Sequence, residues 1–137
     1  MSPHKNNLLT IGRVAKISGV SIETIRYYER IGLLAKPVRG VNGYRIYSAE
    51  QADAVIFISR SRKLGFALST IRDLLRLAER SEHCEKVRAV TVAHRNNVRQ
   101  QIDALRQIER ALNELVDKCG PDTSPNCPII DELKQRQ

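Results

Sequence analysis

Apolar residues first recur at helical spacing near the N-terminus of the chain. Thr10 is a candidate N-cap for a first short helix, and Ser21 is a candidate N-cap for a second, over residues 22–31, that ends at Gly32. The apolar face of the first helix is formed by Ile11, Val14, Ala15 and Ile17. Two short helices joined by a glycine-containing turn have the spacing of a helix-turn-helix, although any small pair of antiparallel helices has it too.

After Pro37 the pattern changes from helical spacing to β-branched and aromatic residues around a turn. An Asn42–Gly43 pair lies inside residues 38–47, which is a strong signal for a β-hairpin. A hairpin that follows a helix-turn-helix is a wing, and it can lie along the backbone of a nucleic-acid duplex.

Two further helices are predicted after the hairpin. The residues from Ser48 to Gln51 form a capping-box sequence that begins a helix ending near Lys63. Residues 64–66 interrupt this helix, and Ser69 is the candidate cap of a further helix through Leu77. The core face of that helix is predicted to hold Ile71, Leu74, Leu75 and Ala78.

Residues 82–119 contain no Gly or Pro and can form one long helix. A heptad pattern with alternating steps of three and four runs through Cys84, Val87, Thr91, His94, Val98, Gln101, Leu105, Ile108, Leu112, Leu115 and Cys119. An apolar stripe on a single long helix must be buried against a partner. A second copy of the chain is the favoured partner, and packing on the N-terminal domain is the alternative.

The charge of the chain is concentrated in its first part. The 137 residues have a net charge of +8, and residues 1–80 account for all of it, with 14 Lys or Arg and 6 Asp or Glu. Residues 81–137 are neutral, with nine Lys or Arg and nine Asp or Glu. All four tyrosines lie in the basic part, which predicts a polyanionic partner. The longest apolar run has five residues and no signal-peptide stretch is present, so we expect a cytoplasmic protein with no membrane partner.

All three cysteines lie in the neutral part, and in a reducing compartment they are expected to be thiols or metal ligands. Cys84 and Cys119 are five heptads apart, so they share a helix face at ends separated by about 52 Å. In an antiparallel dimer centred near Gln101 and Ile102, each Cys84 would lie beside the partner's Cys119. The Pro- and Gly-containing loop before Cys127 could return it to Cys119, giving three sulfurs at each end. Three unrelated buried cysteines are the alternative.

At this point the motifs resemble those of a known family. Residues 24–29 (TIRYYE), 32–34 (GLL), 42–47 (NGYRIY), 64–66 (LGF) and 127–130 (CPII) are similar to the MerR family of bacterial transcription regulators, and the resemblance extends from Leu9 to Leu133. It implies a mainly α-helical fold: a winged helix-turn-helix DNA-binding domain (1–80), a dimerisation helix (81–119) in an antiparallel coiled coil, and a metal-binding loop with a short C-terminal helix (120–137).

The resemblance also implies a mechanism and a set of DNA contacts. The homodimer would bind a promoter whose spacer is too long and, with an effector bound, distort that spacer so that RNA polymerase engages both elements. Thr24 and Arg26 would face the major groove, and Tyr27 or Tyr28 would bond a phosphate. The remaining contacts to the DNA backbone would come from Lys16, Arg39, Tyr44, Arg45 and Arg62.

The identity of the effector depends on the metal ligands Cys84, Cys119 and Cys127. Three thiolates favour a soft ion over Mg²⁺ or Ca²⁺. Residues 82–85 (EHCE) resemble the mercury sensors of the family, whereas its copper and silver sensors have a serine in place of Cys84. The seven residues between Cys119 and Cys127 resemble the copper sensors instead. We predict Hg(II), with Cd(II), Pb(II) or Zn(II) as alternatives, Cu(I) or Ag(I) as less favoured ones, and His83 as a candidate fourth ligand.

Two other classes of protein account for less of the sequence. A cytosolic thiol protein that stores metal would explain the cysteines, but it would need neither a wing nor a basic half. An enzyme is not expected, because the histidines His4, His83 and His94 have no recognisable nucleophile and carboxylate partners and the chain has no glycine-rich phosphate loop.

Overall fold

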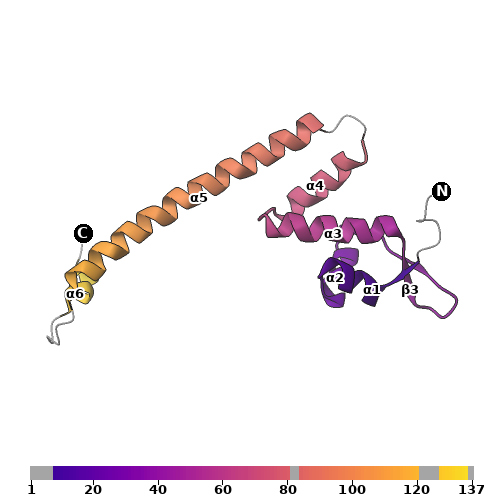
Figure 1. The fold of residues 1–137 in the computed structure, drawn as a ribbon, viewed down its shortest axis with the longest axis horizontal. Coiled ribbons are helices and arrows are strands. Elements are labelled where there is room, and N and C mark those ends of the chain that lie inside the picture. Colours follow the sequence, from indigo (N-terminus) through magenta and orange to yellow (C-terminus); the bar gives the residue numbers. More distant parts are fainter. Residues whose placement is uncertain (1–7, 81–83, 121–126, 136–137) are drawn as a thin grey trace. The chain divides into compact units, whose positions relative to one another are not determined.

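The computed structural model describes residues 8–80, 84–120 and 127–135 (Figure 1). The chain divides into two compact units, Met1–Val87 and Arg88–Gln137. The elements in chain order are β1 (Leu9–Thr10), α1 (Ile11–Ser18), α2 (Ile22–Arg30), β2 (Val38–Arg39), β3 (Arg45–Tyr47), α3 (Ala49–Lys63), α4 (Leu68–Ala78), α5 (Cys84–Lys118) and α6 (Pro128–Lys134).

The helix-turn-helix is formed by α1 and α2, and both predicted N-caps are confirmed. The Thr10 side chain accepts a hydrogen bond from the Arg13 amide at 3.2 Å, and the Ser21 side chain accepts one from the Thr24 amide at 3.1 Å. Gly19 ends α1 at a φ of 71°, a left-handed conformation that costs glycine little. The turn between the helices is therefore fixed by local chemistry on both sides.

The wing is a small antiparallel sheet with strand order β1–β3–β2. The predicted hairpin is confirmed: Val38 pairs with Ile46, and the Gly43 amide donates to the Gly40 carbonyl at 3.0 Å, with Gly43 at a φ of 75°. The strand β1, in which Leu9 pairs with Tyr47, has only two residues, too few for the alternation that would predict a strand.

The next helix, α3, begins with the predicted capping box. The Gln51 amide donates to the Ser48 hydroxyl at 3.1 Å, and the Ser48 amide donates to the Gln51 side chain at 2.8 Å. The helix ends at Lys63 as predicted, and Gly65 follows it with a φ of 87°.

The start of α4 corrects one prediction. The N-cap is Ala67, which makes no side-chain cap, and Ser69 lies inside the helix. Burial of Phe66, which is 6% exposed and whose amide donates to the Ser61 carbonyl at 3.2 Å, fixes the chain just before α4. The helix consequently begins two residues earlier than a Ser69 cap would allow, because packing outweighs capping here.

The core of the first unit takes a fully buried side chain from each of four helices and from the wing. These side chains are Val14, Ile25, Tyr47, Val55, Ile58 and Ile71. Ile17, which was expected on the core face of α1, is instead 46% exposed. The buried line of this helix runs through Val14 and Ser18, four residues apart, so that Ile17 falls at its edge.

The long helix predicted over residues 82–119 is confirmed as α5, which ends one residue earlier, at Lys118; the first two predicted residues lie outside the described part of the chain. It is one unbroken helix of 35 residues, drawn from pink to orange in Figure 1, and none of its described side chains is buried. Its exposed large apolar residues are Ile102, Leu105, Ile108, Leu112 and Val116. Among the described residues, no helix is both long and apolar enough to cross a membrane.

Candidate nucleic-acid interface and thiol pair

The second helix of the helix-turn-helix presents polar and aromatic side chains on its outer face. Arg26 is exposed and Thr24 is half-buried. Tyr27 is 42% exposed, with the guanidinium carbon of Arg30 lying 5.8 Å from its ring centroid. Tyr28 is only 7% exposed and belongs to the core. Of the two tyrosines, Tyr27 is thus the one whose ring is available at the surface.

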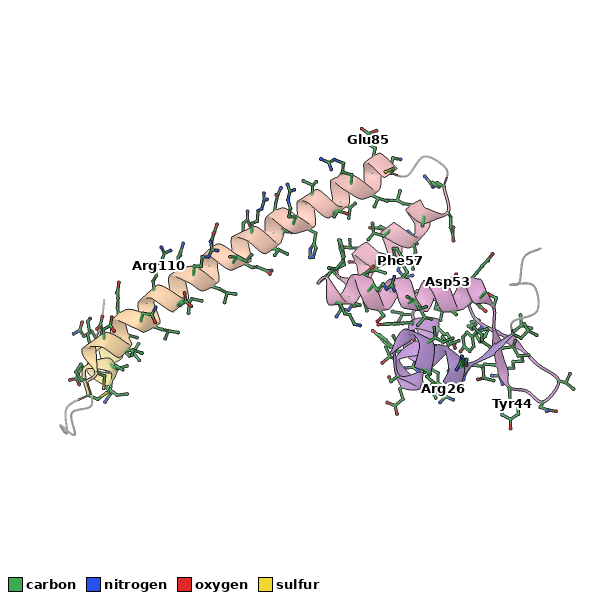
Figure 2. The ribbon with its side chains drawn as sticks, viewed as in Figure 1. Arg26, Tyr44, Asp53, Phe57, Glu85 and Arg110 are labelled. Carbon is green, nitrogen blue, oxygen red and sulfur yellow. The ribbon has the colours of Figure 1, made fainter. Side chains whose placement is uncertain are left out.

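A basic hollow of about 560 Å³ lies beside α2 and the wing. The residues that line this basic hollow are Arg26, Glu29, Arg30, Lys36, Pro37, Arg39 and Arg45. Five of these seven side chains are cations, a composition suited to a polyanion. Figure 2 shows Arg26 and Tyr44 on the side of the first unit away from α3.

One carboxylate lies among these cations. Glu29, on α2, is 6% exposed, and it accepts a hydrogen bond from the Tyr47 hydroxyl on β3. The Arg45 Nε, also on β3, lies 3.5 Å from the Glu29 Oε2. Burial, followed by the hydrogen bond and the negative charge of Glu29, raises the pKa of Tyr47 well above its usual range. This network joins α2, which is the recognition helix of the helix-turn-helix, to the wing.

The other predicted contacts to the DNA backbone lie on α1, the wing and α3. Lys16 is exposed on α1, and Tyr44 is 73% exposed on the wing loop. Arg39 donates to the Gly43 carbonyl at 3.3 Å, which supports the wing loop. Arg62 donates to the Phe66 carbonyl at 2.9 Å, so that it also stabilises the turn between α3 and α4.

The sequence interpretation missed several residues of this surface. Arg30 and Lys36 line the basic hollow and were not singled out. Glu29 carried a usable signal, because it lies one helical turn after the buried Ile25, on the face that should be apolar. Arg72 carried no such signal: its guanidinium donates to two carbonyls just after the end of α2, from 40 and 41 residues away in sequence. The acceptors are the carbonyl oxygens of Ile31, at 2.8 Å, and Gly32, at 3.3 Å.

The second unit brings two of the three predicted metal ligands together. Cys119 follows α5 directly and Cys127 is the N-cap of α6; their thiols lie close enough to affect each other's ionisation. The backbone amide of Ile130, and then that of Ile129, lower the pKa of Cys127. Desolvation, followed by the negative charge of Cys127, raises the pKa of Cys119.

The charged pair Lys118 and Glu132 joins the end of α5 to α6 beside these thiols. Cys84 is exposed at the first position of α5, and His83 lies outside the described residues. Within the described part of the chain, no three His, Cys, Asp or Glu side chains come together in a group that could hold a metal. One chain therefore supplies a pair of soft sulfur donors, which fits a thiophilic ion but leaves its coordination short of three sulfurs.

A helix-turn-helix followed by a wing, with exposed cations on the recognition helix and beside the wing, defines a winged-helix DNA-binding protein. Comparison with known families agrees with this class. The model described as "MerR family regulatory protein" matches residues 10–47, and the model described as "MerR, DNA binding" matches residues 53–115.

Individual relatives cover nearly the whole chain. The mercuric resistance operon regulatory protein of Bacillus cereus is 40% identical over 128 residues, which are 92% of this chain and 97% of the relative. The transcription regulator PbrR691 of Ralstonia metallidurans, in complex with lead(II), has a TM-score of 0.79 at 36% identity and covers 91% of this chain and 98% of its own. The regulator MerR of Bacillus megaterium, in complex with mercury(II), has a TM-score of 0.74 at 36% identity and covers 93% and 100%.

The chain belongs to the MerR family. Members of this family are DNA-binding transcription regulators rather than enzymes, which confirms the expectation from the sequence.

Proposed function

We propose that this regulator senses a thiophilic metal ion, Hg(II) above others, and converts its binding into a change in promoter shape. The observation that carries the proposal is the Cys119–Cys127 thiol pair at the end of α5. The lowered pKa of Cys127 favours its thiolate, a soft metal ligand, and metal binding would displace the proton of the neighbouring Cys119 thiol.

The third sulfur comes from a second copy of the chain. A continuous helix as long as α5 separates Cys84 from Cys119 by about 52 Å, so one chain cannot offer both to one ion. An antiparallel homodimer places Cys84 of each chain beside the partner's Cys119 and buries the apolar residues that α5 exposes. The two effector sites then lie at the two ends of the coiled coil.

Mercury is favoured by the relatives as well as by the donor set. The Bacillus cereus relative is named for mercuric resistance, and the Bacillus megaterium structure holds mercury(II), whereas the Ralstonia metallidurans structure holds lead(II). Three thiolates suit both ions, and Cd(II) in addition. Zn(II) is less well served, because it usually takes four ligands.

The DNA contacts are assigned to the exposed residues of the first unit. Thr24 and Arg26 read the major groove and Tyr27 binds a phosphate, while the other contacts to the backbone come from Lys16, Arg39, Tyr44, Arg45 and Arg62. Metal binding distorts the promoter spacer so that RNA polymerase engages both promoter elements. The protein acts in the cytoplasm, where the promoter DNA and RNA polymerase are found.

A competition among metals tests this function. The dimer is titrated with Hg(II), Pb(II), Cd(II), Zn(II) and Cu(I) against a common thiol chelator, and transcription from the target promoter is measured at the same free concentrations. Hg(II) should bind tightest and activate at the lowest free concentration. Activation by another ion at a lower free concentration would assign that ion as the effector. Tight binding of Hg(II) without activation of transcription would show that metal binding does not control the promoter.

A further inference from the structure

Glu29 is an unexpected residue at a DNA-binding surface. It is the one acidic side chain among the lining residues of the basic hollow, and it is 6% exposed. A carboxylate beside a phosphate backbone repels it, and a buried carboxylate also loses hydration. Its contacts with the wing compensate for these costs.

Both oxygens of Glu29 contact the same wing strand. Oε1 accepts the hydrogen bond of the Tyr47 hydroxyl, and Oε2 lies 3.5 Å from the Arg45 Nε. The partners are two residues apart on β3, so their side chains extend from the same face of the strand. Glu29 thereby ties α2 to the wing at two points.

The contact with Arg45 uses one side of the guanidinium group. Nε is the guanidinium nitrogen that contacts Glu29, and among the described residues the two terminal nitrogens of Arg45 make no hydrogen bond. Arg45 is 31% exposed and lines the basic hollow. A guanidinium that is held through Nε keeps the pair of donors that binds a phosphate in bidentate fashion.

We propose that Glu29 is a positioning residue for DNA binding: it holds Arg45 through Nε so that the two terminal nitrogens of Arg45 bind one phosphate of the DNA backbone in the basic hollow. This inference rests on the DNA contact proposed for Arg45. Glu29 itself touches no DNA, and its effect on affinity passes through Arg45.

The sign of the effect separates this role from plain electrostatics. Removing a negative charge near DNA strengthens binding when the charge only repels. When the charge orients an arginine, removing it weakens binding, because the arginine loses its fixed geometry. Glu29→Gln keeps an oxygen that accepts the Tyr47 hydrogen bond, and it removes only the charge that holds Arg45.

The experiment measures the affinity of the full-length protein for a fluorescently labelled 30-base-pair duplex of mixed sequence at several salt concentrations. We expect Glu29→Gln to bind up to about fivefold more weakly at 0.15 M salt, with the salt slope lower by up to about 0.9 per bound subunit, the change for one phosphate contact. The matched control, Glu23→Gln, removes an acid from the first turn of the same helix and should bind as well as the wild type or more tightly.

A double-mutant cycle shows whether Glu29 acts through Arg45. In the Arg45→Ala background, Glu29→Gln should cause no further loss of affinity. An equal loss in both backgrounds, or tighter binding by Glu29→Gln alone, would overturn the inference. Thermal unfolding of each variant is followed in parallel, and the affinity change should not scale with the change in midpoint temperature.

A second substitution keeps the inference testable if Glu29→Gln does not fold. Arg45→Lys keeps the positive charge and can still pair with Glu29, but it lacks a second pair of donors for the phosphate. We expect it to bind DNA about as weakly as Arg45→Ala, and binding equal to the wild type would reject the proposed geometry. If the wild type binds no duplex at any salt concentration, the proposed DNA-binding function itself fails, an outcome distinct from these.

Discussion

The phenol of Tyr47 donates a hydrogen bond to the buried carboxylate of Glu29, and this bond connects the last residue of the wing strand to the recognition helix. The two residues are 18 positions apart, and both are shielded from solvent. A wing attached in this way keeps a defined position against the recognition helix before any DNA is present.

Tyr47→Phe should lower the free energy of unfolding by about 1–3 kcal/mol at pH 7, because it leaves one buried oxygen of Glu29 without its donor. The pKa of Tyr47 is raised in the folded state, so its contribution is complete below the unfolded pKa of tyrosine, about 10, and is lost as the pH rises through the folded value. Denaturant unfolding at a series of pH values should therefore show the wild type approaching the variant above about pH 10. Tyr44→Phe, at a tyrosine that is 73% exposed, serves as the control and should change little.

Arg26→Ala should abolish recognition of the operator, because Arg26 is the exposed arginine in the middle of the recognition helix. Binding to mixed-sequence DNA should fall much less. Gel-shift titrations with operator and mixed-sequence duplexes at physiological salt measure the difference. Arg110→Ala makes the same charge change on α5 and should preserve operator affinity; an unchanged affinity in Arg26→Ala would refute the assignment of α2.

Leu105→Glu together with Leu112→Glu should convert the dimer to a monomer. Both side chains are more than half exposed in the single chain, at 64% and 54%, and they lie on the stripe that the proposed coiled coil buries. Sedimentation equilibrium gives the mass directly. Arg110→Glu puts the same new charge on an outward position of α5 and should stay dimeric, whereas a dimeric double variant would point to a different interface.

Mutant subunits with complementary cysteine losses should rescue each other. A Cys84→Ser homodimer lacks one sulfur at each proposed site, and a Cys119→Ser/Cys127→Ser homodimer retains only one. Their heterodimer has all three sulfurs at one end and none at the other, so it should regain one tight Hg(II) site.

The readout for this rescue is the ultraviolet charge-transfer band of three-sulfur mercury coordination in the mixed sample. Heterodimer content is confirmed independently by mass spectrometry of differently tagged subunits. An intrachain site predicts no three-sulfur band at any mixing ratio, and that result would exclude the antiparallel register centred on Gln101.

The features that were predicted correctly depend on residues close together in sequence. Thr10, Ser21 and Ser48 bond amides within three positions, and Gly43 closes a four-residue turn, so that each motif is visible in a short window. The start of α4 was mispredicted, because the burial of Phe66 decides it, not the capping ability of Ser69.

Contacts between distant segments were not predictable from the sequence. Nothing in the sequence around Arg72 indicates that it donates to the Ile31 carbonyl just after α2, 41 residues earlier, because many arginines have the same local surroundings. The pairing of Cys119 with Cys127 could be predicted from the sequence, because the loop between them is short and contains two prolines and a glycine. Cys84 cannot contact that pair within one chain, because α5 separates it from Cys119.

The exposed apolar residues of α5 make the proposed dimer sensitive to the amount of protein in the cell. A chain that leaves Leu105, Ile108 and Leu112 in water gains most of its remaining burial only when a second chain arrives. By mass action, each tenfold dilution then removes about 1.4 kcal/mol of the driving force for assembly. Because each metal site needs sulfur from both chains, a scarce regulator would lose metal sensitivity and paired DNA binding together, and gene dosage would set the threshold of the response.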